Sequence, residues 1–451
     1  MKKLAVMIPC LPIAFAFACN GGGGMDTETA GDPTGDPTGD PTGDPTDGGC
    51  IEDEEVPASI TEDTTWACNK LLPADTLVTV SNNAVLTINP GVTIRGKSGS
   101  ALVVAQGSRL EAAGTADMPI VFTSSQADGM RKRGDWGGIV LLGNAATNLA
   151  GGQGQAEGIE NQANYGGGSS PDAAYSCGTL KYVRVEFAGF ELTMDNELNG
   201  IGFYSCGSAT TVDYVQSHMG DDDGLEMFGG NFDAKHIVVT GALDDAIDLD
   251  QGYTGTLQHV FIHQDPTVGN YAFEWSNQSD NQDASPRTSP IACNVTAVGT
   301  GMSPDSKSAG IKLKEGTAGE VHSSIFVNFN RAAVDLTESP TEAQATAGAI
   351  ALKYNIFAQN ALDGSELYVT SEGSTFDLKA FVEDPANNNR IDVDPQLTSA
   401  AWGSPNIVPA AESPVLGAGV VPAACESTDY IGAVKDASGD WTTGWTNYKP
   451  N

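Results

Sequence analysis

The sequence predicts an all-β, single-domain parallel β-solenoid with a cap at each end. Short runs rich in β-branched and aromatic residues recur from residue 76 onward, and Gly, Asn and Asp bound them. The runs repeat at a period of roughly 20 to 30 residues, which is typical of solenoids. They also align residue by residue, so each turn of the coil is expected to stack on the one before it.

Two kinds of run alternate along the chain. The first kind appears at 180–189, 212–220, 234–242, 257–265, 292–300, 322–330 and 352–360. The second kind places one residue between two apolar neighbours, and the middle residues are Gly202, Glu226, Asp248, Glu274, Lys312 and Asp335. Because side chains alternate along a strand, the apolar neighbours are expected to face the core and the middle residues to face outward. We call Glu226, Asp248, Glu274, Lys312 and Asp335 the outward column.

The same reasoning sets the predicted boundaries. The β-helix spans 76–360, where the runs align, and the spacing already pairs Val80 with Val104 near its start. Residues 50–75 form an N-terminal cap and residues 361–451 a C-terminal cap and tail, because the open ends of a solenoid are strand edges that need cover.

The N-terminus predicts export. Residues 1–18 have the form of a signal peptide, with two lysines before an apolar run that is too short to span a bilayer. Cys19 follows Ala-Phe-Ala, which resembles a lipobox with Ala where Leu is usual, and is the predicted lipidation site. Residues 19–49 hold a Gly run and four GDPT repeats, which cannot form a core and are expected to act as a tether. We therefore expect a lipid anchor at the cell surface, in the outer membrane; secretion without lipid is the alternative.

The charge of the chain limits its partners. The formal net charge is −36, which excludes nucleic acid as a partner. An acidic polymer needs divalent cations or the few basic residues, such as Arg131, Lys132 and Arg133, although a solvated loop is the alternative for that triplet. We expect a monomer whose partners are the membrane, through the lipid, and a polysaccharide or a surface protein.

Six cysteines remain after Cys10 and Cys19 are assigned to the signal peptide and the lipid anchor. An even number in an exported chain predicts disulfides. The sequences YSCGT and YSCGS occupy the same turn of successive rungs, which places their cysteines within disulfide range. The predicted pairs are Cys177 with Cys206 and, by elimination, Cys50 with Cys68 and Cys293 with Cys425.

Aspartates at two successive turns predict a cation site. GDDDG at 220–224 and LDDAIDLD at 243–250 are brought side by side by stacking, and a hard cation relieves the repulsion between their carboxylates. A calcium ion is the candidate cofactor, and its candidate ligands are Asp222, Asp223, Glu226, Asp244, Asp245 and Asp248. The first run is no EF-hand, because Gly230 stands where that motif needs Glu. The alternative is that these aspartates form turns and accept backbone N–H groups.

The outward column is also the candidate catalytic site. A uronate lyase needs a base beside cation-loaded carboxylates, and carboxylates on adjacent rungs have the spacing of a glycosidase pair. The candidates are Lys312 as base and Glu226, Asp248 and Glu274 as metal ligands or acid/base pair. The alternative is that Lys312 only neutralises acidic neighbours across the strands.

A second outward stripe becomes apolar toward the C-terminus. Its predicted members are Arg184, Gln216, Val238, Phe261, Thr296, Phe326 and Phe357. An apolar stripe of this kind needs a cover, either the C-terminal tail or a partner, and the tail is the simpler choice. A long loop at 144–178 is expected to fold over the carboxylate face.

Ordered motifs link the chain to a known family. ALVVAQGSRLEAAGTADMPIVFTS, RGDWGGIVLLGNA, CGTLKYVRVEFAG, DDDGLEMFGG, KHIVVTGALDDAIDLDQGYTG and WTTGWTNY occur in this order. They resemble a family of uncharacterised bacterial surface lipoproteins, which implies a right-handed parallel β-helix and a surface location but no activity. Pectate lyases share this fold, and fold alone does not carry function.

The leading prediction is a surface-displayed lipoprotein that acts as a binding or structural module toward carbohydrate or cell-surface components. The alternative is a polysaccharide lyase or glycoside hydrolase that acts on an extracellular polysaccharide.

Overall fold

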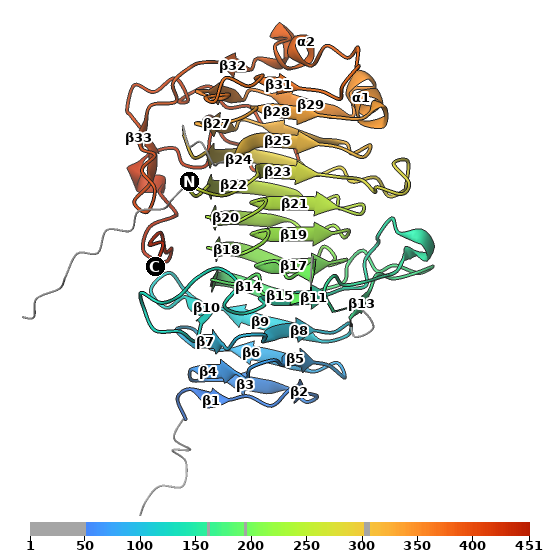
Figure 1. Cartoon of the computed structure of the whole chain (residues 1–451), viewed down its shortest axis with the longest axis vertical. Coiled ribbons are helices and arrows are strands. Elements are labelled where there is room, and N and C mark those ends of the chain that lie inside the picture. The colour runs from blue at the N-terminus through green and yellow to red at the C-terminus, as the bar shows by residue number, and fades with distance from the viewer. Residues whose placement is uncertain (1–50, 160–162, 194–195, 302–306) are drawn as a thin grey trace, which may run out of the picture. The chain divides into compact units, whose positions relative to one another are not determined.

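The computed structural model describes residues 51–159, 163–193, 196–301 and 307–451. Residues 50–451 form one compact unit, and Figure 1 shows it as a right-handed parallel β-helix of stacked rungs. The fold prediction is thus confirmed. The predicted signal peptide, Cys19, the linker and Cys50 lie outside the described residues.

One face of the coil is a parallel sheet that contains eleven strands in the described part of the chain. In order, they are β2 (Ser59–Ile60), β5 (Leu77–Val80), β8 (Ala101–Val104), β11 (Ile139–Leu142), β17 (Ile201–Tyr204), β19 (Leu225–Phe228), β21 (Ile247–Asp250), β23 (Tyr271–Trp275), β25 (Ala309–Leu313), β28 (Val334–Leu336) and β31 (Tyr368–Val369). We call it the eleven-stranded sheet.

The other faces form a second sheet, with seventeen strands among the described residues. They are β1 (Glu54–Glu55), β3 (Thr64–Trp66), β4 (Lys70–Leu72), β6 (Val85–Ile88), β7 (Thr93–Gly96), β9 (Arg109–Ala113), β10 (Ile120–Ser124), β14 (Gly178–Glu186), β18 (Thr211–His218), β20 (Ala234–Thr240), β22 (Thr256–His263), β24 (Ile291–Val298), β26 (Gly319–His322), β27 (Ile325–Val327), β29 (Ile350–Lys353), β30 (Ile356–Ala358) and β32 (Arg390–Ile391). We call it the seventeen-stranded sheet.

The longest strands of this second sheet bend in the middle. One residue in each of β14, β18, β20, β22 and β24 has a positive φ, and these residues are Tyr182, Tyr214, His236, His259 and Asn294. The left-handed conformation turns the strand. Each bent strand therefore contributes to two faces of the coil: the first half of β14 pairs with β9 and the second half with β10.

Short elements leave the coil. Antiparallel pairs join β12 (Gly154–Gln155) to β13 (Asn164–Tyr165), β15 (Glu191–Thr193) to β16 (Asn196–Glu197), and β33 (Leu397–Ser399) to β34 (Asn406–Pro409). The helices are α1 (Ser339–Thr346) and α2 (Leu378–Val382), with 3-10 turns at Ala150–Gly152, Pro385–Asn387 and Ala437–Gly439. Within the described ranges, neither helix is long and apolar enough to cross a bilayer.

The register agrees with the sequence alignment. The outward column is in register from Glu226 through Asp248, Glu274 and Lys312 to Asp335. Its apolar neighbours are fully buried in the core; they are Leu225, Met227, Ile247, Leu249, Phe273, Trp275, Ile311 and Leu313. The pairing of Val80 with Val104 is also present.

Parallel pairing extends past both predicted limits of the β-helix. Ser59 pairs with Thr79 near the start of the coil, and Ile391 pairs with Phe357 near its end. The strands that continue the coil into the predicted caps have only two or three residues each, so they leave little unpaired edge.

Two of the predicted disulfides are present. Cys177 and Cys206 are bonded with their Cα atoms 5.6 Å apart, and Cys293 is bonded to Cys425 with a Cα separation of 6.6 Å. The third predicted pair involves Cys50, which lies outside the described residues.

The apolar stripe contains one error of register. Its last two members are Ile325 and Ile356, which continue the column of Phe261 and Thr296. Phe326 and Phe357 point into the core instead. Adjacent side chains of a strand face opposite sides, so an alignment error of one residue exchanged the two faces.

The C-terminal tail covers this stripe. Val238, Phe261 and Ile356 lie in one buried cluster with tail residues such as Val415 and Trp445, and Figure 1 shows the segment after β32 alongside the coil. Polar contacts hold the tail as well: Gln216 Nε2 donates to the Asn447 carbonyl oxygen (2.6 Å) and Gln216 Oε1 accepts from the Asn447 N–H (2.8 Å).

We expect Gln216→Ala to lower the free energy of unfolding by about 1–3 kcal/mol, because it leaves two backbone groups of the covered tail without partners. Chemical denaturation measures this loss. The exposed Gln126 supplies the control, since Gln126→Ala is expected to change the free energy by no more than about 0.5 kcal/mol. Equal stabilities of the two variants would contradict the assigned role of the amide.

Candidate metal centre

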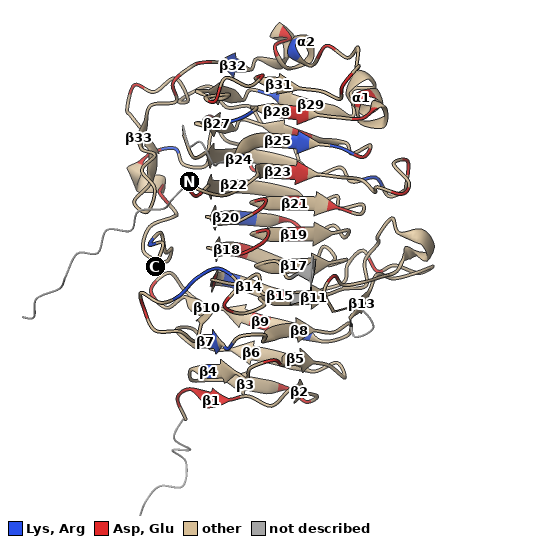
Figure 2. Ribbon diagram, in the orientation of Figure 1, with Lys and Arg blue, Asp and Glu red and all other residues tan. Residues whose placement is uncertain are grey.

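Acidic side chains follow one another along the outer side of the eleven-stranded sheet. Figure 2 shows acidic residues on β21 and β23 and a basic residue on the next strand, β25. A second acidic column lies at the turn that precedes these strands, where Asp223 stacks on Asp245 because Leu225 pairs with Ile247. We call the two columns together, from Asp222 to Glu274, the acidic ladder.

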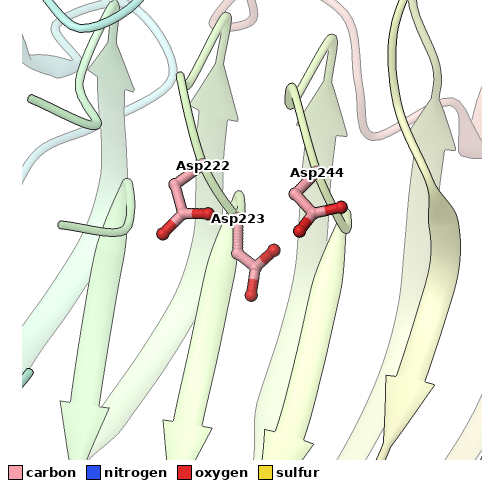
Figure 3. A group of neighbouring side chains, drawn as sticks. All are labelled: Asp222, Asp223 and Asp244. Atoms are coloured by element: carbon pink, nitrogen blue, oxygen red, sulfur yellow. The ribbon is translucent and has the colours of Figure 1, made fainter. Parts of the chain in front are cut away.

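Three overlapping groups of carboxylates lie close enough to share a cation. Within each group, one oxygen atom per residue lies within 4.8 Å of the others; the groups are Asp222, Asp223 and Asp244, then Asp223, Glu226 and Asp248, then Asp245, Asp248 and Glu274. Figure 3 shows the first group, which comes from two neighbouring turns. All six predicted metal ligands are therefore brought together, and Glu274, predicted as catalytic, joins them.

Two of the aspartates also have the turn role that was the alternative. Asp223 Oδ1 accepts the Asp245 N–H (2.8 Å), and Asp245 Oδ1 accepts the Tyr271 N–H (2.5 Å). Each such bond ties one rung to the next and uses one carboxylate oxygen. Gly230, where an EF-hand would need Glu, has a φ of 84°, and a Cβ there would lie 2.2 Å from the Cys206 carbonyl oxygen.

Two buried oxygen atoms in and beside the ladder have no hydrogen-bond partner within the described part of the chain: Asp248 Oδ1 in the ladder and Asn199 Oδ1 beside it. Asn199 is 5% exposed, and its Nδ2 donates to Glu226 Oε2 (2.5 Å). A buried polar atom without a partner costs free energy, and a cation bound by Asp248 would satisfy its Oδ1.

Asn199 was not among the predicted residues. It precedes Gly200 as Asp223 precedes Gly224, and the register of Ile201 with Leu225 puts it at the head of the aspartate column. An alignment extended by one rung would have found it.

The ladder is more buried than an outward column suggests. Glu226 points away from the core, yet it is only 8% exposed. Burial raises the pKa of Asp223, Glu226, Asp245 and Asp248, and neighbouring carboxylates raise it further. Asp250, also missed by the sequence analysis, has its pKa raised by burial to about 7.

Two lysines lie next to the C-terminal end of the ladder and pair with carboxylates. Lys312 Nζ lies 3.0 Å from Asp335 Oδ1, as expected if it neutralises an acidic neighbour. Lys314, which was not predicted, forms an ion pair with Glu274. Burial alone lowers the pKa of Lys314, but its carboxylate neighbours outweigh burial and raise it. A general base must lose its proton near neutral pH, so the Lys314 ion pair favours a structural role.

A comparison with protein families identifies this fold. The model of the pectate-lyase like beta helix domain matches residues 58–404. The chain belongs to this family. Among solved structures, it is similar to one titled "Crystal structure of pectate lyase Pel9A", with 9% identity, 85% of each chain covered and a TM-score of 0.34. This likeness is too low to say anything about the site, and no curated protein matches the chain.

In this pectate-lyase-like β-helix, the loop at 144–178 packs on the eleven-stranded sheet. Its residues Ala156, Ile159 and Tyr165 share a buried cluster with Tyr204 of β17 and Phe228 of β19. Glu157 lies close enough to Glu226 to raise its pKa. The loop therefore covers the N-terminal part of the ladder, which explains the burial of Glu226.

Proposed function

We propose that the chain is a surface-displayed, carbohydrate-binding β-helix whose acidic ladder holds calcium. Two observations support a bound cation. Three overlapping groups of carboxylates have oxygens within 4.8 Å of one another, and Asp248 Oδ1 has no hydrogen-bond partner among the described residues. The family description supports a carbohydrate-related role. The predicted export signal and lipidation of Cys19 support surface display.

The donor set suits calcium. The ligands are oxygens of carboxylates and an amide, which are hard donors, and calcium accepts six to eight of them in irregular geometry. Asp223, Glu226 and Asp248 offer one such set, and the Asn199 side chain lies next to it, because its Nδ2 donates to Glu226 Oε2. Since several buried carboxylates repel one another, a divalent cation would offset charge that the two lysines at the end of the ladder leave uncompensated.

The second candidate function is a polysaccharide lyase. Lys312 favours it, because the column places this amine one rung from Glu274. Against it, Lys312 is already paired with Asp335, and three carboxylates of the ladder are buried: Asp223, Glu226 and Asp245. We therefore propose a binding function in preference to a catalytic one.

One experiment separates the two functions. The compact unit, residues 50–451, is incubated with neutral and acidic polysaccharides, with calcium or with EDTA. Retention on each polymer measures binding, and ultraviolet absorbance and reducing ends measure cleavage. We expect calcium-dependent retention and no products. Products that disappear in Lys312→Ala but not in Lys97→Ala, a lysine outside the ladder, would establish the lyase; absence of retention on every polymer would refute carbohydrate binding.

A further inference from the structure

A cavity of about 440 Å³ lies between the seventeen-stranded sheet and the C-terminal tail. Its floor consists of outward side chains of β7, β10 and β14, where Val121 pairs with both Thr93 and Arg184. Its walls are the loop that carries Arg131 and the tail at Lys449. We call this cavity the arginine pocket. It lies on a different sheet from the acidic ladder.

The pocket is positively charged in a chain that is strongly negative. Four of its lining residues are basic and one is acidic; they are Arg95, Arg131, Arg184, Lys449 and Glu186. The whole chain has 22 basic and 58 acidic residues. A local excess of positive charge in such a chain attracts anions that the rest of the surface repels.

Glu186 holds the Arg184 side chain in position and does not occupy the cavity. This buried carboxylate accepts from Arg184 Nε (3.0 Å) and from the Thr123 hydroxyl (2.9 Å). Arg184 Nη1 donates to the Trp445 carbonyl oxygen (2.7 Å). The guanidinium is thus fixed at two nitrogens, so little side-chain entropy is lost when an anion binds it.

The other basic side chains of the pocket have exposed acidic partners, or none among the residues that the structure describes. Arg95 pairs with Asp53 and Arg131 with Asp128, and both acidic side chains are largely exposed. Exposed pairs contribute little, so an incoming anion can replace them. Lys449 has no acidic partner among the residues that the structure describes.

The size and the polar lining fit a sugar. Small-ligand sites have volumes of roughly 300 to 1,000 Å³, and the polar residues Thr93, Thr446 and Asn447 also line this one. We infer that the arginine pocket binds the carboxylate or sulfate group of an acidic saccharide, and that it does so without a divalent cation. This inference rests on the proposed carbohydrate-binding function and assigns it a second subsite.

The test uses residues 50–451 in EDTA at low salt. Calorimetric titrations compare trigalacturonate, its methyl ester, a sulfated trisaccharide and inorganic sulfate. We expect one or both charged saccharides to bind at least about tenfold more tightly than the methyl ester and than sulfate alone, because charged hydrogen bonds and sugar contacts add. The charged saccharide that binds shows whether the pocket recognises a carboxylate or a sulfate group. Lys449→Gln and the double variant Arg131→Gln/Lys449→Gln are expected to weaken that binding, the double variant by about tenfold or more.

Lys132→Gln is the matched control, because Lys132 is adjacent to Arg131 in sequence, is 76% exposed and does not line the pocket. Its binding is expected to be unchanged. Binding of inorganic sulfate as tightly as of the saccharides would mean an adventitious ion only and would overturn the inference. Saccharide binding that needs calcium and ignores the pocket variants would also overturn it, while leaving the proposed function in place.

Discussion

Calcium is expected to stabilise the protein against unfolding at about pH 7.5. One site filled at about 100 times its Kd adds roughly 2.7 kcal/mol, and for a unit of this size that corresponds to a rise of about 3 °C in Tm. The physical reason is the acidic ladder, in which buried carboxylates repel one another and Asp248 Oδ1 has no hydrogen-bond partner in the described ranges. Differential scanning calorimetry in calcium and in EDTA measures the effect.

Substitutions test whether the ladder is responsible. Asp248→Asn is expected to reduce the calcium response by more than half and to leave the stability in EDTA the same or higher, because it removes a negative charge from among other carboxylates. Asp117→Asn, at an exposed position outside the ladder, is expected to retain the full response. A calcium response that survives in Asp248→Asn would place the cation elsewhere.

The calcium response is also expected to disappear as the pH falls to about 4.5. Burial raises the folded-state pKa of four ladder carboxyls, those of Asp223, Glu226, Asp245 and Asp248, and it raises the pKa of the nearby Asp250 to about 7. In EDTA the folded state therefore binds more protons than the unfolded state, and stability falls as the pH rises from about 4 toward 7. Calcium reverses this loss only where the carboxylates are ionised.

Two buried histidines also make the stability depend on pH, so their contribution must be separated from that of calcium. Burial lowers the pKa of His259 and His263 to about 4. Because their folded pKa values lie below the ordinary value near 6.5, they contribute stability that is present above about pH 6.5 and is lost as the pH falls toward 4. The difference between calcium and EDTA at each pH cancels this contribution, so that difference is the quantity to compare.

Trp445→Ala is expected to lower the free energy of unfolding by about 3–5 kcal/mol. Trp445 is 1% exposed, and its ring lies 5.8 Å from that of Tyr182 and 6.0 Å from that of Tyr214. Its removal leaves a cavity beneath the tail. Denaturant titration measures the loss, and proteolysis of the tail shows whether the tail detaches before the coil unfolds.

The control for this variant is Met130→Ala, since Met130 is 70% exposed and its truncation is expected to cost no more than about 0.5 kcal/mol. If Trp445→Ala lost less than about 1 kcal/mol, the tail would be a loose cover and not part of the folded core.

Much of the coil was predictable because its stacking repeats one local rule. The alternation around Glu226 and Asp248 fixed both the register and the inward residues, and the repeated YSCG turn located the disulfide of Cys177. The error at Phe326 and Phe357 arose where two runs are each broken into separate short strands, β26 and β27 in one and β29 and β30 in the other, so that neither run offers a continuous pattern to align.

The site was less predictable, since it depends on segments that do not repeat. The burial of Glu226 comes from the loop at 144–178, whose path over the sheet no periodicity determines. The pairing of Lys314 with Glu274 depends on side-chain reach between rungs. The arginine pocket joins Arg131 to Lys449, which are far apart in sequence and meet only because the tail returns along the coil.

The path of the tail has a consequence for how the coil unfolds. In a solenoid each rung contacts only its neighbours, so rungs at an end can unravel one at a time. Here the C-terminal tail forms hydrogen bonds to residues on rungs from β14 to β26, namely Arg184, Gln258, Thr296 and Ser323. A disulfide between Cys425 and Cys293 also attaches the tail to the coil. Loss of any one of these rungs disturbs contacts on the others. The tail is therefore expected to make the rungs that it contacts, from β14 to β26, unfold together.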